Sequence, residues 1–150
     1  MWIDFAICGM IRGMDTVHIR SPRSLSSAFI PEEFLPEGHD QYTIRNAQFG
    51  ASDREWRGLT SDEVEILVKN GNTADDWAEV RVTDRFDPTM IHNNSFFGFV
   101  RIGTVENVVL EHHDLKLPVG ITNCRVVSCD IGDHVALHNV HYLAHYVIGD

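Results

Sequence analysis

The sequence predicts a mainly β protein that begins with a small helical segment and continues into coils of short parallel strands. The first observation is an apolar residue followed by Gly, which recurs at intervals of 17, 12 and 17 residues, each within one of a multiple of six. Such periodicity is typical of hexapeptide β-helices, in which three hexads make one coil. The pairs are Ile102-Gly103, Val119-Gly120, Ile131-Gly132 and Ile148-Gly149.

The second observation is the composition after residue 90, where apolar residues are mostly β-branched and form no helical stripe. Residues 101–150 contain neither Asn-Gly nor Asp-Gly, the turns that ordinary antiparallel hairpins favour. Hexads are clearest at Ile131, Leu137 and Leu143. Residues 104–118 fit the repeat poorly, so we expect a loop or an irregular first coil there.

The third observation is a pair of helix signals at residues 60–79. Thr60 and Glu63 form a capping box, and Gly71 stops the helix, which is expected from about Ser61 to Asn70. Thr73-x-x-Asp76 offers a second cap, for a short helix at about Trp77 to Glu79. These signals together predict a helical hairpin at about residues 60–79.

The flanking segments complete the expected order of elements. Tyr42, Ile44 and Phe49 predict a short strand within residues 42–58, with a turn at Gly50. Alternating valines predict a strand at residues 80–82, and Asp87-Pro88 predicts a turn. The predicted domains are a poorly ordered N-terminal extension at 1–41, a helical cap segment at 42–90, and the start of a truncated hexapeptide-repeat β-helix at 91–150.

Composition bounds the partners and the compartment. The net charge of −10 argues against nucleic acid and against anionic membrane surfaces as partners. No stretch of 18 apolar residues is present, so no membrane span is expected. Three cysteines without a Cys-x-x-Cys spacing suit a reducing compartment, and we expect a cytoplasmic protein.

Several blocks resemble an uncharacterised family of large bacterial proteins that open with a small helical segment and continue into a left-handed parallel β-helix of the hexapeptide-transferase type. The resemblance covers residues 42–150 and implies that this chain is an N-terminal piece of a longer protein. The wider superfamily includes acyltransferases, sugar-nucleotide enzymes and metal-dependent hydratases. The blocks are Leu59–Leu67, Asn72–Trp77, Arg85–Pro88, His113–Ile121, Cys129–Asp133 and Tyr142–Asp150.

Histidines are the candidate functional residues, because seven of the nine lie in residues 91–150. His112, His113 and Asp114 are the candidate catalytic group, since an imidazole base suits acyl transfer and loops carry sites. His112, His113 and His138 are the candidates for a metal site that lowers the pKa of bound water. The alternative is that these histidines are polar corner and surface residues. No cofactor is indicated by a nucleotide or phosphate motif.

Two functions remain open at this point. One is a transferase-like enzyme acting on an activated acyl or sugar donor, with the donor site in coils outside this chain. The other is a non-catalytic structural module that closes one end of a solenoid and aids assembly, because solenoids need terminal caps. Metal binding through histidines is a further alternative. An open strand edge exposes unpaired backbone, so we also expect homo-oligomers through the β-helix or weak stability of the chain alone.

Overall fold

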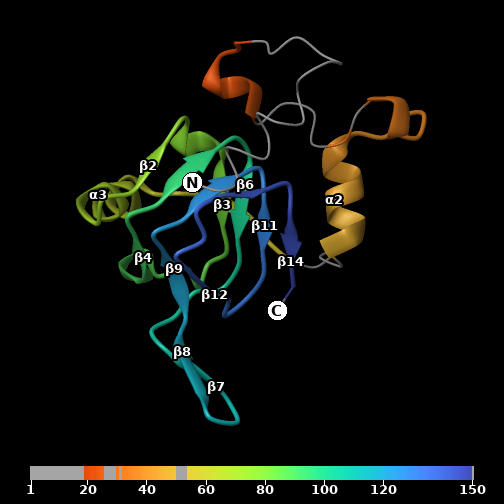
Figure 1. Ribbon diagram of the computed structural model, residues 1–150. Coiled ribbons are helices and arrows are strands. Elements are labelled where there is room, and N and C mark those ends of the chain that lie inside the picture. The colour runs from red at the N-terminus through yellow and green to blue at the C-terminus, as the bar shows by residue number, and fades with distance from the viewer. Residues whose placement is uncertain (1–18, 26–29, 31, 50–53, 150) are drawn as a thin grey trace, which may run out of the picture.

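The computed structural model describes residues 19–25, 30, 32–49 and 54–149 of the 150-residue chain. The described part is mainly β, with two α-helices that come early in the sequence and lie on opposite sides of the strands (Figure 1). Most of the predicted extension at residues 1–41 and the predicted turn at Gly50 lie outside the described residues. Within that extension, Pro22–Leu25 and Glu32–Phe34 form single 3-10 turns.

The strands form three sheets and one separate hairpin. The first sheet has the order β1-β3-β6-β11-β14, the second β13-β10-β5-β2 and the third β12-β9-β4. All neighbours in these sheets are parallel except β1 and β3. The bounds are β1 Arg57–Gly58, β2 Thr73–Ala74, β3 Val80–Val82, β4 Ile91–His92, β5 Ser95–Phe97, β6 Val100–Ile102, β7 Val109–His112, β8 Leu115–Pro118, β9 Gly120–Thr122, β10 Arg125–Val127, β11 Asp130–Ile131, β12 Ala136–His138, β13 Leu143–Ala144 and β14 Val147–Ile148.

From β2 onward, apart from the β7–β8 hairpin, the chain visits the second, first and third sheets in turn and then repeats that order. The expected 17-residue coil is confirmed at Ile131 and Ile148, which are direct partners. The same interval between Ile102 and Val119 is not a coil, because Ile102 pairs with Ile131. The reason is the β7–β8 hairpin, which lies between them and lengthens that coil; it stands where a loop or an irregular first coil is expected from the sequence.

The core consists of apolar side chains stacked from coil to coil inside the three sheets. Parallel pairing in register places each side chain over its equivalent in the next coil, and this buries them without any helical packing. Phe96, Ile121 and Ile131 in the middle of their stacks are at most 1% exposed. The stacks are Ala74–Phe96–Val126–Leu143, Val82–Ile102–Ile131–Ile148 and Ile91–Ile121–Leu137.

A ladder of asparagines marks one corner of the coils. Asn93, Asn123 and Asn139 all have positive φ, a conformation that asparagine tolerates better than most residues. The Asn93 side-chain amide donates to Asn123 and the Asn123 amide donates to Asn139, each at 2.8 Å. The corner is therefore specified by residue type as well as by backbone geometry.

Close approach of successive coils explains two of the apolar-Gly pairs. A Cβ on Gly103 would lie 2.7 Å from the Gly132 carbonyl oxygen, and the Gly103 N–H donates to the Ile131 carbonyl at 2.8 Å. Gly120 has φ of +138°, and its Cβ would lie 2.4 Å from the Met90 carbonyl oxygen. Glycine is therefore required there by contact between coils.

Helix α3 (Ser61–Lys69) confirms the first predicted helix and its capping box. The Thr60 hydroxyl accepts from the Glu63 N–H at 3.2 Å, and the Glu63 carboxylate accepts from the Thr60 N–H at 2.8 Å. The helix buries Leu67, which is 1% exposed, against the first coil.

The second predicted helix is present only as one short turn, so the predicted helical hairpin does not form. Thr73 begins β2, and only Trp77–Glu79 forms a single 3-10 turn, capped by Asp76. The N–H groups of Thr73 and Asp75 donate to carbonyls of Asn94 and Phe96 in the next coil. Sheet pairing therefore overrides the local helix signal.

The strand predicted from Tyr42, Ile44 and Phe49 is also wrong, because Gln41–Phe49 is helix α2, and the strand found within residues 42–58 is β1 at Arg57–Gly58. Asp40 stabilises its start by accepting from the Thr43 N–H at 2.7 Å. Tyr42, Arg45 and Phe49 are spaced for one helical face, and this face meets the first sheet. The spacing of Tyr42 and Phe49 therefore follows the period of a helix and not the two-residue alternation of a strand.

A buried ion triad attaches α2 to the outer face of the first sheet. Asp130 on β11 accepts from Arg45 on α2 at 2.7 and 2.9 Å, and from Arg101 on β6 at 2.6 and 2.8 Å. Arg45 and Asp130 are fully buried, and Arg101 is 4% exposed. The Phe99 carbonyl accepts a further hydrogen bond from Arg45 at 3.0 Å, and Asn46 accepts one from Arg101.

Aromatic rings enclose the two guanidinium groups. The Arg45 guanidinium lies 5.2 Å from the Phe99 ring centroid, and that of Arg101 lies 5.4 Å from the Trp56 ring. Faces of aromatic rings attract cations, which offsets part of the cost of burying two positive charges against one carboxylate. Burial by itself would raise the pKa of Asp130, but the hydrogen bonds from Arg101 and Arg45 outweigh it and hold this pKa below its usual value.

The substitution Asp130→Asn tests the triad. It leaves two buried guanidinium groups without a counter-charge, so we expect a loss of about 3–5 kcal/mol in the free energy of unfolding. Urea unfolding followed by tryptophan fluorescence measures it. Asp84→Asn is the control, because the Asp84 side chain is 81% exposed beside Arg57 and an exposed pair contributes only about 0–1 kcal/mol. Equal losses in the two variants would contradict the assignment.

Acid titration tests the same carboxylate. Because the folded-state pKa of Asp130 is lowered, its stabilisation is present above the unfolded-state pKa near 4 and is lost as the pH falls through the folded-state value. We therefore expect the free energy of unfolding to fall with pH more steeply below about pH 4 in the wild-type protein than in Asp130→Asn. Parallel slopes in that range would show that Asp130 is not the linked group.

Candidate functional site

The predicted catalytic group lies at the tip of the β7–β8 hairpin, which extends away from the coils (Figure 1). His113 and Asp114 form the two-residue turn, with His113 at φ of 53°, and His112 is the last residue of β7. The two imidazole rings meet edge to face with centroids 4.3 Å apart. Sequence proximity thus brings the three residues together, on a surface exposed to solvent.

The structure does not bring His138 to that tip. The His138 Nε2–H donates to the Pro118 carbonyl at 2.9 Å, and Pro118 pairs with Val109 at the base of the hairpin. Three residues of strand, about 10 Å, separate this base from the tip. Among the described residues, no three His, Cys, Asp or Glu side chains are grouped so as to hold a metal ion. The metal site stays a prediction, which elemental analysis of untagged protein tests.

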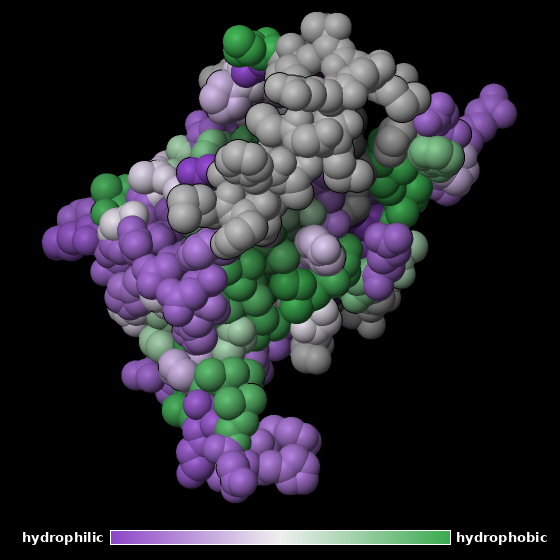
Figure 2. All heavy atoms as spheres, in the orientation of Figure 1, coloured by the Kyte–Doolittle hydropathy of each residue, from purple (hydrophilic) through white to green (hydrophobic). Residues whose placement is uncertain are grey.

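The hairpin itself is apolar along its stem and polar at its tip (Figure 2). Leu110 pairs with Leu117 on one face, and Glu111 pairs with Lys116 on the other at 3.3 Å. Leu115 is 57% exposed and Val109 is 61% exposed. Exposed apolar surface of this kind marks a contact site, so the stem is a candidate interaction surface.

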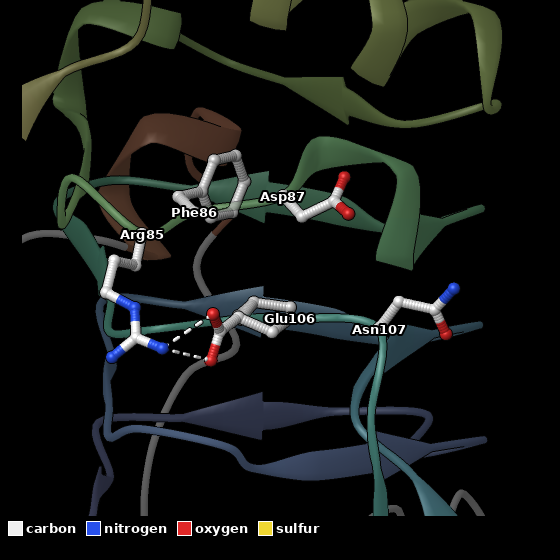
Figure 3. Close-up of a pocket in the computed structure, with 6 residues that line it drawn as sticks. Arg85, Phe86, Asp87, Glu106 and Asn107 are labelled. Carbon is white, nitrogen blue, oxygen red and sulfur yellow. Dashed lines mark hydrogen bonds and ion pairs between the residues drawn. The ribbon is translucent and has the colours of Figure 1, made fainter.

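A charged cluster lies at the root of the hairpin, which sequence reasoning missed. Glu106 accepts from the Arg85 guanidinium at 2.7 Å through both carboxylate oxygens (Figure 3). The Glu106 Oε2 also lies 2.9 Å from His134 Nε2. Beside it is a cavity of about 390 Å³, lined also by Asp87 and Asn107. The hydrogen bond from His134, followed by that from Arg85, holds the pKa of Glu106 below its usual value.

The coil geometry positions this cluster. Residues Phe86 and Val105 form a parallel bridge, which places Arg85 beside Glu106. The His134 N–H donates to the Thr104 carbonyl at 2.8 Å, and this hydrogen bond seats His134 at the same corner. An ionised carboxylate that fixes one imidazole nitrogen leaves the other to act as a base or a ligand. No short sequence motif signals residues this far apart.

The structure defines a mainly β protein in which parallel strands from successive coils form three sheets. The chain belongs to a family described as "Domain of unknown function (DUF4954)", which matches residues 56–150. The predicted resemblance to an uncharacterised family is thereby confirmed, and hexapeptide-repeat character stays a prediction.

A relative from Treponema pallidum (strain Nichols), described as "Uncharacterized protein", is 40% identical over 134 residues. The aligned part is 89% of this chain but only 18% of the relative, so the chain spans less than a fifth of that protein's length. No solved structure matches the chain. Within the described residues, no helix combines the length and apolar character needed to cross a bilayer.

Substitution of His134 tests the cluster. Because the hydrogen bond from His134 is the largest influence lowering the Glu106 pKa, His134→Ala should raise that pKa towards its ordinary value. Carbon-13 NMR titration of the glutamate carboxyl groups measures it. His138→Ala is the matched control, since His138 bonds a carbonyl instead. An unchanged Glu106 titration in His134→Ala would show that the contact is not formed in solution.

Proposed function

We propose that this chain is the end module of a longer left-handed β-helix of the hexapeptide-repeat type. In it α3 caps the first coil, α2 braces the outer face of the first sheet, and the last coil contacts the next one. The observation that carries the proposal is the asymmetry of burial along the interior stacks. The support from the comparisons is the length of the relative, which leaves room for many further coils.

The N-terminal end of the stacks is covered. Leu67 of α3 lies in the core cluster with Ile91 of the first coil. The Asn72 side-chain amide donates to the carbonyls of Leu67 and Ile91, each at 2.8 Å, and joins the helix to that coil. Strand β1 pairs antiparallel with β3 and so covers the outer edge of the first sheet. A polar-faced cap of this kind is what a solenoid end requires.

The other end of the stacks is open among the described residues. Leu137, Leu143 and Ile148 form the last layer and are only half-buried, whereas their partners in the preceding coil are buried. Strands β12, β13 and β14 have a partner on one side only. Figure 2 shows apolar surface gathered over this end of the coils. A following coil, or a second copy of the chain in a homo-oligomer, would bury this layer.

A transferase-like activity of the whole protein on an activated acyl or sugar donor is the second candidate. The observation that favours it is the His134–Glu106 contact at 2.9 Å beside the 390 Å³ cavity, since a carboxylate-oriented imidazole suits deprotonation of an acceptor hydroxyl or amine. Activity of the full-length protein that falls in a His134→Gln variant but not in His138→Gln supports this candidate. Full activity in His134→Gln removes it.

Paired alanine substitutions test the end-module proposal. In the isolated chain, Ile121→Ala should cost about 2–5 kcal/mol in the free energy of unfolding, whereas Leu137→Ala, in the half-buried layer, should cost about 1 kcal/mol or less. In the full-length protein the next coil covers Leu137, so its cost should rise to match that of Ile121. Urea unfolding of the chain and hydrogen exchange of β9 and β12 in the longer protein measure these costs. An unchanged small cost for Leu137→Ala in the longer protein would contradict the proposal.

A further inference from the structure

A second cavity, of about 580 Å³, lies where the N-terminal segment meets the second sheet. Arg125 on β10 forms one wall, with its guanidinium 5.8 Å from the ring centroid of Phe97 on β5. The turn at Pro22–Leu25 forms the other wall. The lining residues are Arg20, Ser21, Pro22, Ser24, Leu25, Phe97 and Arg125.

The segment is attached to the coils next to this cavity. His145 Nε2 donates to the Leu25 carbonyl at 3.2 Å, across 120 positions of sequence. His145 lies at the corner after β13, and its N–H donates to the Val127 carbonyl at the end of β10. His145 therefore holds the two walls of the cavity together.

The charge of this cavity is opposite to that of the chain. Among the described residues, its lining contains two arginines and no carboxylate, although the chain carries a net charge of −10. Five of the other arginines contact carboxylates: Arg45, Arg54, Arg57, Arg85 and Arg101. Within the described residues, Arg20 and Arg125 make no such pair. Two unneutralised guanidinium groups facing one cavity favour a doubly charged anion.

We propose that this cavity binds a small organic phosphate. The planar guanidinium groups of Arg20 and Arg125 match phosphate oxygens in geometry and charge. Pro22, Leu25 and Phe97 supply an apolar surface for the organic part. This cavity shares no lining residue with the cavity beside Glu106, and the proposal does not depend on the end-module function.

Titration with phenyl phosphate, inorganic phosphate and benzyl alcohol tests the proposal, with backbone amide shifts in NMR as the readout. We expect saturable shifts at β5, β10 and residues 20–25 with phenyl phosphate, weaker binding of inorganic phosphate, and no saturable binding of the neutral alcohol. Arg125→Gln should weaken phenyl phosphate binding by about tenfold or more. Arg81→Gln is the matched control, because Arg81 on β3 lies outside the cavity and also lacks a carboxylate partner among the described residues.

Arg20→Gln gives a second test that does not alter the coils, since Arg20 is an exposed residue before the turn. It should weaken phenyl phosphate binding by a similar factor. This result would support the site even if Arg125→Gln also alters folding. Unchanged affinity in Arg20→Gln, equal binding of benzyl alcohol, or shifts that never saturate would each overturn the proposal.

Discussion

The structure depends on one carboxylate, Asp130, which neutralises two arginines inside the protein. Its two oxygens receive four hydrogen bonds, from Arg45 on α2 and Arg101 on the neighbouring coil. Removing water from three charged groups costs free energy. The well-aligned hydrogen bonds between the carboxylate and the two guanidinium groups offset only part of that cost. Two guanidinium groups share one negative charge, so the surrounding rings of Phe99 and Trp56 also contribute. A one-residue shift in strand register would break all of these contacts.

The triad therefore holds neighbouring coils together on the outer face of the first sheet, as apolar stacking holds them together in the interior. Stacked apolar residues are interchangeable in chemistry, so a shift of register by two residues would still bury hydrophobic side chains. The ion triad, the asparagine ladder and the Gly103–Gly132 contact each permit only one register. We conclude that polar and steric contacts specify the alignment of coils whose stability comes from their apolar interior.

Local signals in the sequence predicted what depends on local contacts. The Thr60–Glu63 capping box gave the right helix because both partners lie within one turn, and the interval from Ile131 to Ile148 gave a real coil. The predictions that failed depended on distant partners: β2 forms because it pairs in parallel with β5. The triad joins residues that are 85 and 29 positions apart. The hexad repeat also gives no information about the hairpin, because the residues of an insertion do not follow the repeat.

The same reasoning explains why the functional candidates from sequence and structure differ. His112 and His113 are predicted from sequence because they lie in the stretch that fits the hexad repeat worst, and the hairpin places them at a tip exposed to solvent. Glu106 and His134 are 28 positions apart but meet at the root of that hairpin, where the insertion leaves the coil. A coil can accept an insertion at such a corner without loss of register, because β6 and β11 still pair across it. Chemistry in this fold is therefore expected at the corners where insertions begin, since there a new segment meets side chains that the stacked strands already hold in place.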